Sequence, residues 1–167
     1  VAEAFQMAAL KKLPILYLVQ DNEWDISAHA SEVRAVDATH YAKGFGLKTY
    51  TIDGTDFTKS YQTIQDAFIE IRDKRTPILI HAKVPLLNHH TSGVRMEWYR
   101  DDLEEAKSRD PLPKLKTELL ANGFTKQDLV EIEKKAKETV LSDYQKALKA
   151  EDPNPEDLFS HDYAPTP

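Results

Sequence analysis

Cysteine is absent from all 167 residues of the chain. Its absence excludes disulfides, thiolate catalysis and zinc or iron–sulfur sites that depend on cysteine. The chain also lacks an apolar run near the roughly 20 residues that cross a bilayer, and its first residues lack the basic and apolar segments of a signal peptide. Positive charge is not in excess, because the formal net charge is −6, whereas nucleic-acid surfaces are usually basic. We expect a soluble, cytoplasmic domain that binds neither nucleic acid nor membranes.

The residues that are present have an ordinary globular composition, 41% hydrophobic and 30% charged, in a chain long enough to bury one core. Apolar residues at helical spacing alternate with short continuous apolar runs, which are typical of parallel strands covered on both faces. This order predicts an α/β fold with a parallel sheet flanked by helices. The predicted strands cover residues 15–19, 47–52 and 78–82, and the predicted helices cover residues 2–10, 37–42 and 57–72.

The second half of the chain is charged and helical. Asn122 and Gly123 predict a helix stop, and Thr125 with Asp128 forms the pattern of a capping pair for the helix that follows. The end of the chain is rich in proline and is predicted to be extended. We therefore predict three regions, at residues 1–100, 101–151 and 152–167, which are an α/β domain, a helical extension and a proline-rich tail or linker.

Ligands of an open parallel sheet bind outside the carboxyl ends of its strands. Two predicted loops, at residues 20–34 and 85–100, follow such ends, so their polar side chains are expected in one neighbourhood. The Asn22 side chain and a nearby carbonyl offer the hard oxygen ligands that Mg²⁺ or Ca²⁺ prefers, although such clusters are commonly plain turns. His89 and His90 offer a general acid or base near neutral pH, or they form a solvated loop.

A zinc hydrolase is a poor alternative. The six histidines are scattered along the sequence, and no H-x-x-x-H or H-E-x-x-H pattern occurs. Adjacent side chains such as His89 and His90 tend to diverge rather than to chelate one ion.

Three segments, in this order, resemble a known family over nearly the whole chain. Residues 13–27 resemble the end of the thiamine-diphosphate motif of alpha-type 2-oxo acid dehydrogenases, where a strand runs into Asn-Asn-x-Tyr-x-Ile-Ser. Residues 89–92 and then 98–100 resemble the active-site loop of that family, His-His-Ser-Thr-Ser followed by Tyr-Arg. The segment Pro-Asn-Pro-Glu-Asp-Leu-Phe-Ser at 153–160 is similar to the branched-chain (2-oxoisovalerate) type more than to the pyruvate type.

This resemblance implies that thiamine diphosphate and Mg²⁺ are the cofactors. It implies that Asn22, through its side-chain oxygen, and Trp24, through its main-chain carbonyl, bind the metal. Gln20 and Ile26 would lie against the cofactor, with Ile26 near its thiazolium region. Residues 1–100 would then be the later part of the diphosphate-binding domain.

The same resemblance assigns the catalytic residues and the reaction. His90, with His89 beside it, would lie near the diphosphate and the reacting centre, whereas Tyr99 and Arg100 would anchor the loop. The reaction would be oxidative decarboxylation of a branched-chain 2-oxo acid or of pyruvate, with acyl transfer to a lipoyl group. The implied partners are a beta-type subunit or domain, a lipoyl-bearing acyltransferase and a second copy of the chain.

Several residues depart from the family pattern. Gln20 stands where a basic residue is usual, and Asp21 and Asp25 add negative charge near a polyphosphate. Thr91 occupies the position of a phosphorylated serine of mitochondrial enzymes, but we predict no such regulation here. The Gly-Asp-Gly start of the motif, with its metal-binding carboxylate, does not precede Asn22 in this sequence.

Because that start is missing, we expect a fragment with a truncated fold, prone to self-association and inactive alone. Two alternatives remain open. The chain could belong to another thiamine-diphosphate enzyme, of the transketolase or acetoin type. It could also be a non-catalytic scaffold that kept the fold and lost the site, as the residues Gln20, Asp21 and Asp25 would suggest.

Overall fold

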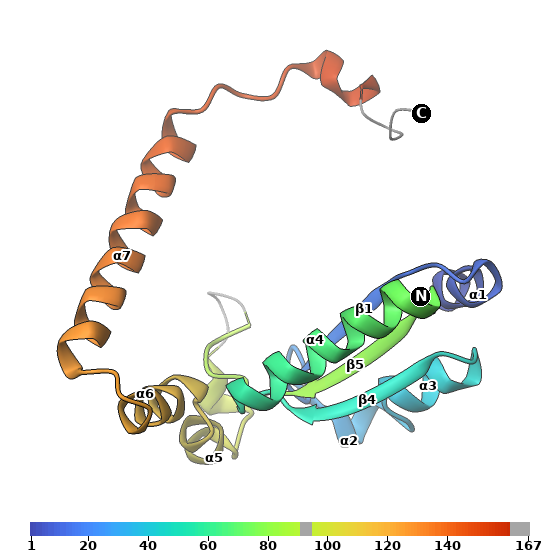
Figure 1. The fold of residues 1–167 in the computed structure, drawn as a ribbon, viewed down its shortest axis with the longest axis horizontal. Helices are drawn as coiled ribbons and strands as arrows, with labels where there is room; N and C mark the ends of the chain where they lie inside the picture. Colours follow the sequence, from blue (N-terminus) through green and yellow to red (C-terminus); the bar gives the residue numbers. More distant parts are fainter. Residues whose placement is uncertain (91–94, 161–167) are drawn as a thin grey trace. The chain divides into compact units, whose positions relative to one another are not determined.

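The structure is a computed structural model that describes residues 1–90 and 95–160. Its internal contacts divide the chain into two units, Val1–Leu119 and Leu120–Pro167, and each is described here by itself. The first unit confirms the predicted α/β class, with a parallel sheet flanked by helices (Figure 1). The region boundaries predicted after residues 100 and 151 stay predictions.

Three parallel strands form the sheet, in the order β1–β5–β4. They are β1 (Leu16–Asp21), β4 (Lys48–Asp53) and β5 (Ile78–Lys83). The register pairs Asp21 and Asp53 with Lys83 on either side, so the carboxyl ends of all three strands lie level at one edge. As expected, the polar segments that follow β1 and β5 therefore start from adjacent points.

The central strand is more deeply buried than its neighbours. Ile78, Leu79 and Ile80 of β5 have no exposed surface, whereas Leu18 of β1 is 48% exposed. The prediction that the apolar strands are covered on both faces is thus right for β5 and wrong for β1. The reason is position, because β1 has a strand neighbour on one side only in the described sheet.

Helices cover the two faces of the sheet (Figure 1). Helix α4 (Phe57–Lys74) packs on one face through Ala67 and Ile71, and helices α1 (Ala2–Lys11) and α3 (Ala38–Gly44) cover the other. The buried core of the α4 face consists of Ile52, Ala67, Ile71, Ile78, Ile80 and Ala82. The buried core of the α1–α3 face consists of Phe5, Ala42, Leu47 and Leu79. Each fully buried aliphatic side chain stabilises the fold by about 1.5–3 kcal/mol.

Aspartate caps set where two of these helices begin. Asp37 accepts hydrogen bonds from the main-chain N–H groups of Thr39 and His40 (2.9 and 3.0 Å) at the start of α3. Asp56 accepts one from Lys59 (2.8 Å) at the start of α4. Each cap satisfies N–H groups that would otherwise have no partner in the first helical turn.

Residues 20–34 were expected to be a loop, and the structure corrects this. Strand β1 continues to Asp21, and an antiparallel hairpin follows, formed by β2 (Trp24–Asp25) and β3 (Ala28–His29). The short helix α2 (Ala30–Val33) completes the segment. The hairpin was missed because its two-residue turn, at positions 26 and 27, contains none of the glycine or asparagine residues that normally mark such turns.

Beyond β5 the first unit contains η1 (Met96–Trp98), α5 (Leu103–Ser108) and α6 (Pro111–Ala121). Helix α6 ends at the predicted stop, and Gly123 takes the left-handed conformation (φ 96°) that favours glycine. None of the helices in the described ranges is both long and apolar enough to span a membrane.

The second unit consists mainly of helix α7 (Lys126–Lys149). Thr125 and Asp128 form the predicted reciprocal cap at its start, which confirms that prediction. The tail was expected to be extended, but residues Pro155–Phe159 form a 3₁₀ turn, η2. Asn154 begins that turn by accepting a hydrogen bond from the Glu156 N–H (3.0 Å).

Candidate functional site

Two consecutive side chains reverse the chain at the end of β1. The Asp21 carboxylate accepts a hydrogen bond from the Glu23 N–H (2.9 Å), and the Asn22 side-chain oxygen accepts one from the Trp24 N–H (3.0 Å). Such contacts to the residue two positions on are typical of Asp and Asn in turns. Glu23 between them is left-handed (φ 65°). Residues 21–24 are called the Asx turn below.

Ile26, in the turn of the hairpin, has an unusual conformation. Its φ is 55°, and its side chain is 50% exposed. A β-branched residue in the left-handed region is strained by about 1–3 kcal/mol, a cost that is commonly found where a site needs a particular side chain. The strain therefore marks Ile26, which was predicted to lie against the cofactor, as a position worth testing.

Gln20 and Asp21 lie on opposite faces of the sheet, because side chains alternate along a strand. Gln20 is exposed, whereas only 9% of Asp21 is accessible. Asp25, further along, is exposed. The two acidic residues that depart from the family pattern are thus in very different surroundings.

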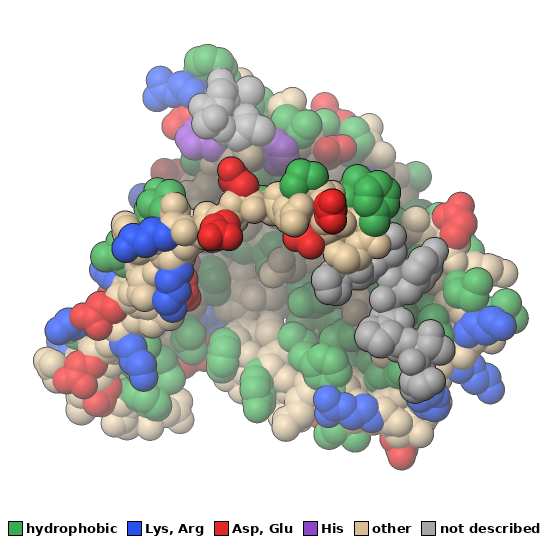
Figure 2. All heavy atoms as spheres, turned by 90° about the horizontal axis from the view of Figure 1, so that it is seen from above, with side chains coloured by type: hydrophobic (Ala, Val, Ile, Leu, Met, Phe, Trp, Pro, Cys, Tyr) green, Lys and Arg blue, Asp and Glu red, His purple; other side chains and the backbone are tan. Residues whose placement is uncertain are grey.

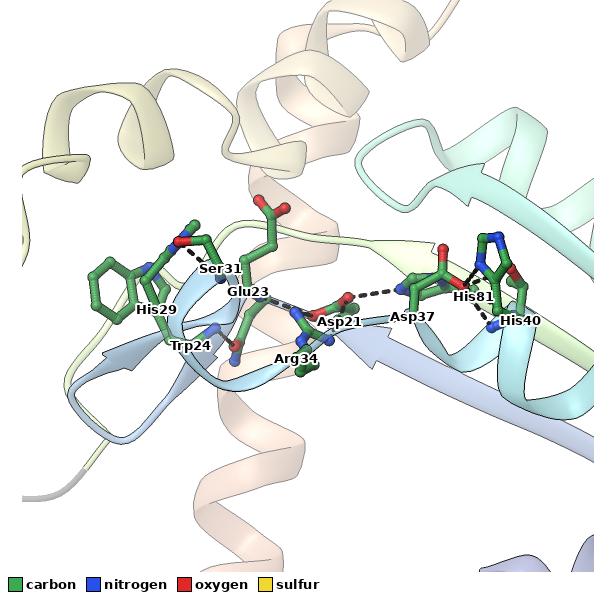
Figure 3. A network of polar contacts seen from close by, with 11 residues as sticks. Asp21, Glu23, Trp24, His29, Ser31, Arg34, Asp37, His40 and His81 are labelled. Atoms are coloured by element: carbon green, nitrogen blue, oxygen red, sulfur yellow. Dashed lines mark hydrogen bonds and ion pairs between the residues drawn. The ribbon is translucent and has the colours of Figure 1, made fainter.

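Asp21 is the centre of a buried ionic cluster on the α3 face (Figure 3). Its carboxylate accepts two hydrogen bonds from the Arg34 guanidinium (2.9 and 3.0 Å) and one from His81 Nε2 (2.7 Å). His81 is 1% exposed and stands in the middle of β5. We call Asp21, Arg34, His81 and Asp37 the Asp21 cluster.

Burial of the Asp21 carboxyl alone would raise its pKa. The hydrogen bonds from Arg34, from the Glu23 N–H and from His81 outweigh this and lower the pKa to about 2. Asp21 is therefore ionised at neutral pH, and its charge is neutralised locally by Arg34. The negative charge expected at Asp21 is thus present, and it is paired with Arg34.

Asp37 closes the Asp21 cluster on the far side of His81 (Figure 3). One of its carboxylate oxygens lies 3.8 Å from His81 Nδ1, and the other lies 2.9 Å from His40 Nδ1. Hydrogen bonds from Thr39 and His40 hold the pKa of Asp37 well below its usual range. In the part of the chain that the structure describes, His81 Nδ1 is buried without a hydrogen-bond partner.

The side chain of Trp24 joins the Asx turn to a distant segment. Its indole N–H donates to Asp102 (3.2 Å), and the Arg100 guanidinium lies 5.2 Å from the ring centre. Tyr99 contacts the same ring edge-on, at 5.7 Å between centroids. The sequence had suggested a role only for the Trp24 main chain, so the structure adds this contact.

Arg100 anchors the segment that Trp24 contacts. It is 5% exposed, donates to the Leu86 carbonyl (2.8 Å) and pairs with both carboxylate oxygens of Asp102 (2.8 and 3.0 Å). This ion pair, opposed by burial and helped by the Trp24 indole, lowers the pKa of Asp102. Arg100 thus fixes both ends of the loop that carries His89 and His90.

The two predicted catalytic histidines are exposed. Histidine side chains also reach the surface in the space-filling view (Figure 2). The Nδ1 atom of His89 accepts a hydrogen bond from the Met96 N–H (3.3 Å), whereas His90 has no hydrogen-bond partner within residues 1–90 and 95–160. Thr91 and the next three residues lie outside the described ranges, and so does His161.

An open groove of about 640 Å³ lies beside Trp24 and the segment from Glu97 to Asp102. Glu32, Glu97, Asp101 and Asp102 contribute carboxylates to it, and Arg100 contributes one guanidinium. This acidic lining would repel a diphosphate.

The donor set of the Asx turn suits a hard cation. Asn22 offers an amide oxygen with a second lone pair free, and Trp24 offers a carbonyl oxygen, both of the type that Mg²⁺ accepts. The described parts of the chain contain no group of three or more His, Asp or Glu side chains able to hold a metal ion. The residues therefore fit a metal that completes its shell with phosphate, water and ligands from other chain segments.

Sequence reasoning missed the Asp21 cluster and the indole contact of Trp24. One signal was available, since a histidine inside the apolar run at residues 78–82 must find a polar partner when buried. That partner is Asp21, 60 positions away, and the contact depends on the register of β1 and β5, which pairs Val19 with His81. No local pattern in the sequence gives that register.

Comparison with known proteins adds a family and several relatives. A model of the family described as "Dehydrogenase E1 component" matches residues 1–156. The pyruvate dehydrogenase E1 component subunit alpha of Rickettsia bellii is 28% identical over 166 residues, which are 98% of this chain and 51% of that protein. The mitochondrial 2-oxoisovalerate dehydrogenase subunit alpha 2 of Arabidopsis thaliana is 30% identical, over 96% of this chain and 35% of that protein.

A third relative, the 3-methyl-2-oxobutanoate dehydrogenase subunit alpha of Mycobacterium tuberculosis, is 31% identical over 78% of this chain and 36% of its own length. The chain thus spans about half the length, or less, of these curated relatives.

Proposed function

The chain belongs to the dehydrogenase E1 component family, and we propose that it supplies the Mg²⁺–diphosphate part of a thiamine-diphosphate site that decarboxylates a 2-oxo acid. The observation that carries this proposal is the Asx turn at the carboxyl end of β1, where Asn22 and Trp24 present neutral oxygens beside a compensated charge. The relatives of the chain are alpha subunits of pyruvate and branched-chain 2-oxo acid dehydrogenases.

In this proposal each residue of the site has a separate task. Asn22 Oδ1 and the Trp24 carbonyl bind Mg²⁺, and Ile26 packs against the cofactor from the strained hairpin turn. When bound, thiamine diphosphate supplies the electron sink that accepts the negative charge left by departing CO₂. His90, exposed and without a partner among the described residues, donates or accepts a proton beside the substrate.

The site as proposed needs more than this chain. It contains no carboxylate cluster for the metal in its described ranges, and it spans about half of the Rickettsia relative. We therefore propose that the remaining ligands come from the rest of a longer protein and from a beta-type partner, and that residues 1–167 alone decarboxylate nothing. A lipoyl-bearing acyltransferase would take the acyl product, and we propose that the assembly works in the cytoplasm.

The branched-chain substrate class is favoured over pyruvate. Relatives of both types match the chain, so they do not distinguish the two substrates. This part of the proposal therefore rests on the segment at 153–160, which is similar to the branched-chain type. Comparing kcat/KM for 2-oxoisovalerate and pyruvate in the assembled enzyme tests it. A preference for pyruvate would contradict this part alone.

Calorimetric titration of thiamine diphosphate, with and without Mg²⁺, tests the site itself. The full-length protein assembled with its partner should bind the cofactor only when Mg²⁺ is present. Asn22→Ala should weaken that binding by about tenfold or more, since it removes a metal ligand. Asn154→Ala is a matched control, because Asn154 makes the same contact to the N–H two positions on, also at 3.0 Å, in the second unit.

Two results would count against the proposed site. Equal effects of Asn22→Ala and Asn154→Ala would mean that Asn22 acts only as a turn residue. No Mg²⁺-dependent binding by the folded assembly would point instead to a scaffold that has lost its cofactor site.

A further inference from the structure

The Asp21 carboxylate is the link between the sheet and the Asx turn. Its Oδ1 atom accepts from the Glu23 N–H and from Arg34, and its Oδ2 atom accepts from Arg34 and His81. Because both oxygens are engaged, the side chain has one orientation. That orientation holds the left-handed Glu23, and with it the path of the chain from Asn22 to Trp24.

Of the two side chains that donate hydrogen bonds to Asp21, His81 is the more firmly fixed. It is 1% exposed in the central strand, and its register partner is Val19, two residues before Asp21 on β1. The side chain of Arg34, by contrast, is 36% exposed and follows the short helix α2. Since Asp21 is ionised, the proton of the hydrogen bond at 2.7 Å belongs to His81 Nε2.

We propose that His81 is a positioning residue for the metal-binding turn, in which its Nε2–H, through Asp21, holds Asn22 Oδ1 and the Trp24 carbonyl in place for a divalent cation. The inference rests on the proposed function of the Asx turn. It concerns a residue that does not touch the metal but sets the geometry of residues that do. Such supporting residues commonly change metal affinity about 10–100-fold when they are replaced.

The alternative is that His81 only satisfies Asp21 inside a packed sheet. Both views predict that loss of His81 destabilises the protein, because it leaves the buried Asp21 carboxylate with one hydrogen-bond donor fewer. Only a positioning role predicts that metal affinity falls further than stability alone explains. Among the described residues, His81 forms a hydrogen bond through Nε2, to Asp21, and none through Nδ1. Two variants, one that keeps a donor at the Nε2 position and one that removes it, can therefore separate the two views.

The test uses the full-length protein assembled with its partner. His81→Gln keeps an amide N–H near the position of Nε2, and His81→Leu removes the donor. The affinity for Mn²⁺, a paramagnetic probe for the Mg²⁺ site, is measured by electron paramagnetic resonance at saturating thiamine diphosphate. The free energy of unfolding is measured in urea. Glu70→Gln is the control, because it removes two ion pairs on the opposite face of the sheet.

We expect His81→Leu to weaken Mn²⁺ binding about tenfold or more, and His81→Gln to stay within about threefold of the wild type. Glu70→Gln should leave the affinity unchanged. If His81→Leu does not fold, His81→Asn replaces it, because its shorter amide does not reach Asp21. Wild-type Mn²⁺ affinity in a folded His81→Leu or His81→Asn variant would overturn the inference. Failure of the wild type itself to bind Mn²⁺ would instead overturn the proposed function, and the inference with it.

Discussion

The sheet carries two ionic clusters on opposite faces, and they differ in burial. On the α3 face, the Asp21 cluster places a 9%-exposed carboxylate against a 1%-exposed histidine. On the α4 face, Glu70 pairs with Lys48 and Lys74 at the rim, where the lysine side chains are 46% and 64% exposed. Similar residue types thus meet in nearly dry and in hydrated surroundings.

This difference in burial determines how much each cluster contributes to stability. An exposed ion pair exchanges easily with water and contributes little, whereas a buried carboxylate that loses its partners is left without solvation. Asp21 also belongs to the Asx turn, so the buried cluster and the turn are directly connected. The comparison therefore predicts that substitutions at Asp21 and at Glu70 have very different effects.

The largest effect is expected for Asp21→Leu. Removal of the carboxylate leaves His81 and Arg34 without their anion and the Glu23 N–H without its acceptor, so the free energy of unfolding should fall by about 3 kcal/mol. Urea unfolding of the variant and the wild type measures this. A loss as small as that of Glu70→Gln would erase the distinction between the two clusters.

The second largest effect is the loss of the stability that ionised Asp21 provides when the protein is acidified. The pKa of Asp21 falls from 3.8 to about 2 on folding, so ionised Asp21 stabilises the protein above about pH 4. That contribution, of about 2 kcal/mol, is lost as the pH falls from about 4 to about 2, because the carboxylate takes up its proton. Unfolding free energies of wild type and Asp21→Asn should therefore converge over this range. A constant difference would contradict the assignment.

An intermediate effect is expected at Trp24, which contacts the half-buried Asp102 and the buried Arg100. Trp24→Phe removes the indole N–H and weakens the contact with the guanidinium, so stability should fall by about 1 kcal/mol. Trypsin should also cut faster after Arg95, in the loop that Arg100 anchors. Trp98→Phe is the control, because Trp98 is 72% exposed and should change neither quantity.

The smallest effect is expected for Glu70→Gln. Its partners are exposed lysines, so the free energy of unfolding should change by about 0.5 kcal/mol or less. Added salt should reduce even this difference, because exposed charges are screened. A loss above about 2 kcal/mol would show that the rim cluster is as important as the buried one.

Much of the fold was predictable because its signals are local. The apolar run of β5 and the Thr125–Asp128 pair each lie within a few residues of sequence, and the structure confirms them. The hairpin after β1 was not predictable, since Ile26 violates the usual turn preference. Local signals therefore gave the layers of the fold but not the shape of the segment that leaves β1.

The candidate site divides in the same way. The position of Asn22 after a strand pointed to a turn, and that turn is present. Contacts such as that of Trp24 with Asp102, 78 positions apart, depend on how distant segments pack and have no sequence signal. Whether Gln20, His89 and His90 act on a cofactor stays a prediction.

The strained conformation of Ile26 has a consequence for evolution in the laboratory. A selection for thermal stability alone should replace Ile26 with glycine, which adopts a positive φ freely and would recover about 1 kcal/mol or more. A selection for turnover should keep an apolar side chain there, if Ile26 packs on the cofactor as proposed. Libraries of the full-length protein assembled with its partner, varied at position 26 and screened under the two regimes, would then diverge at one codon.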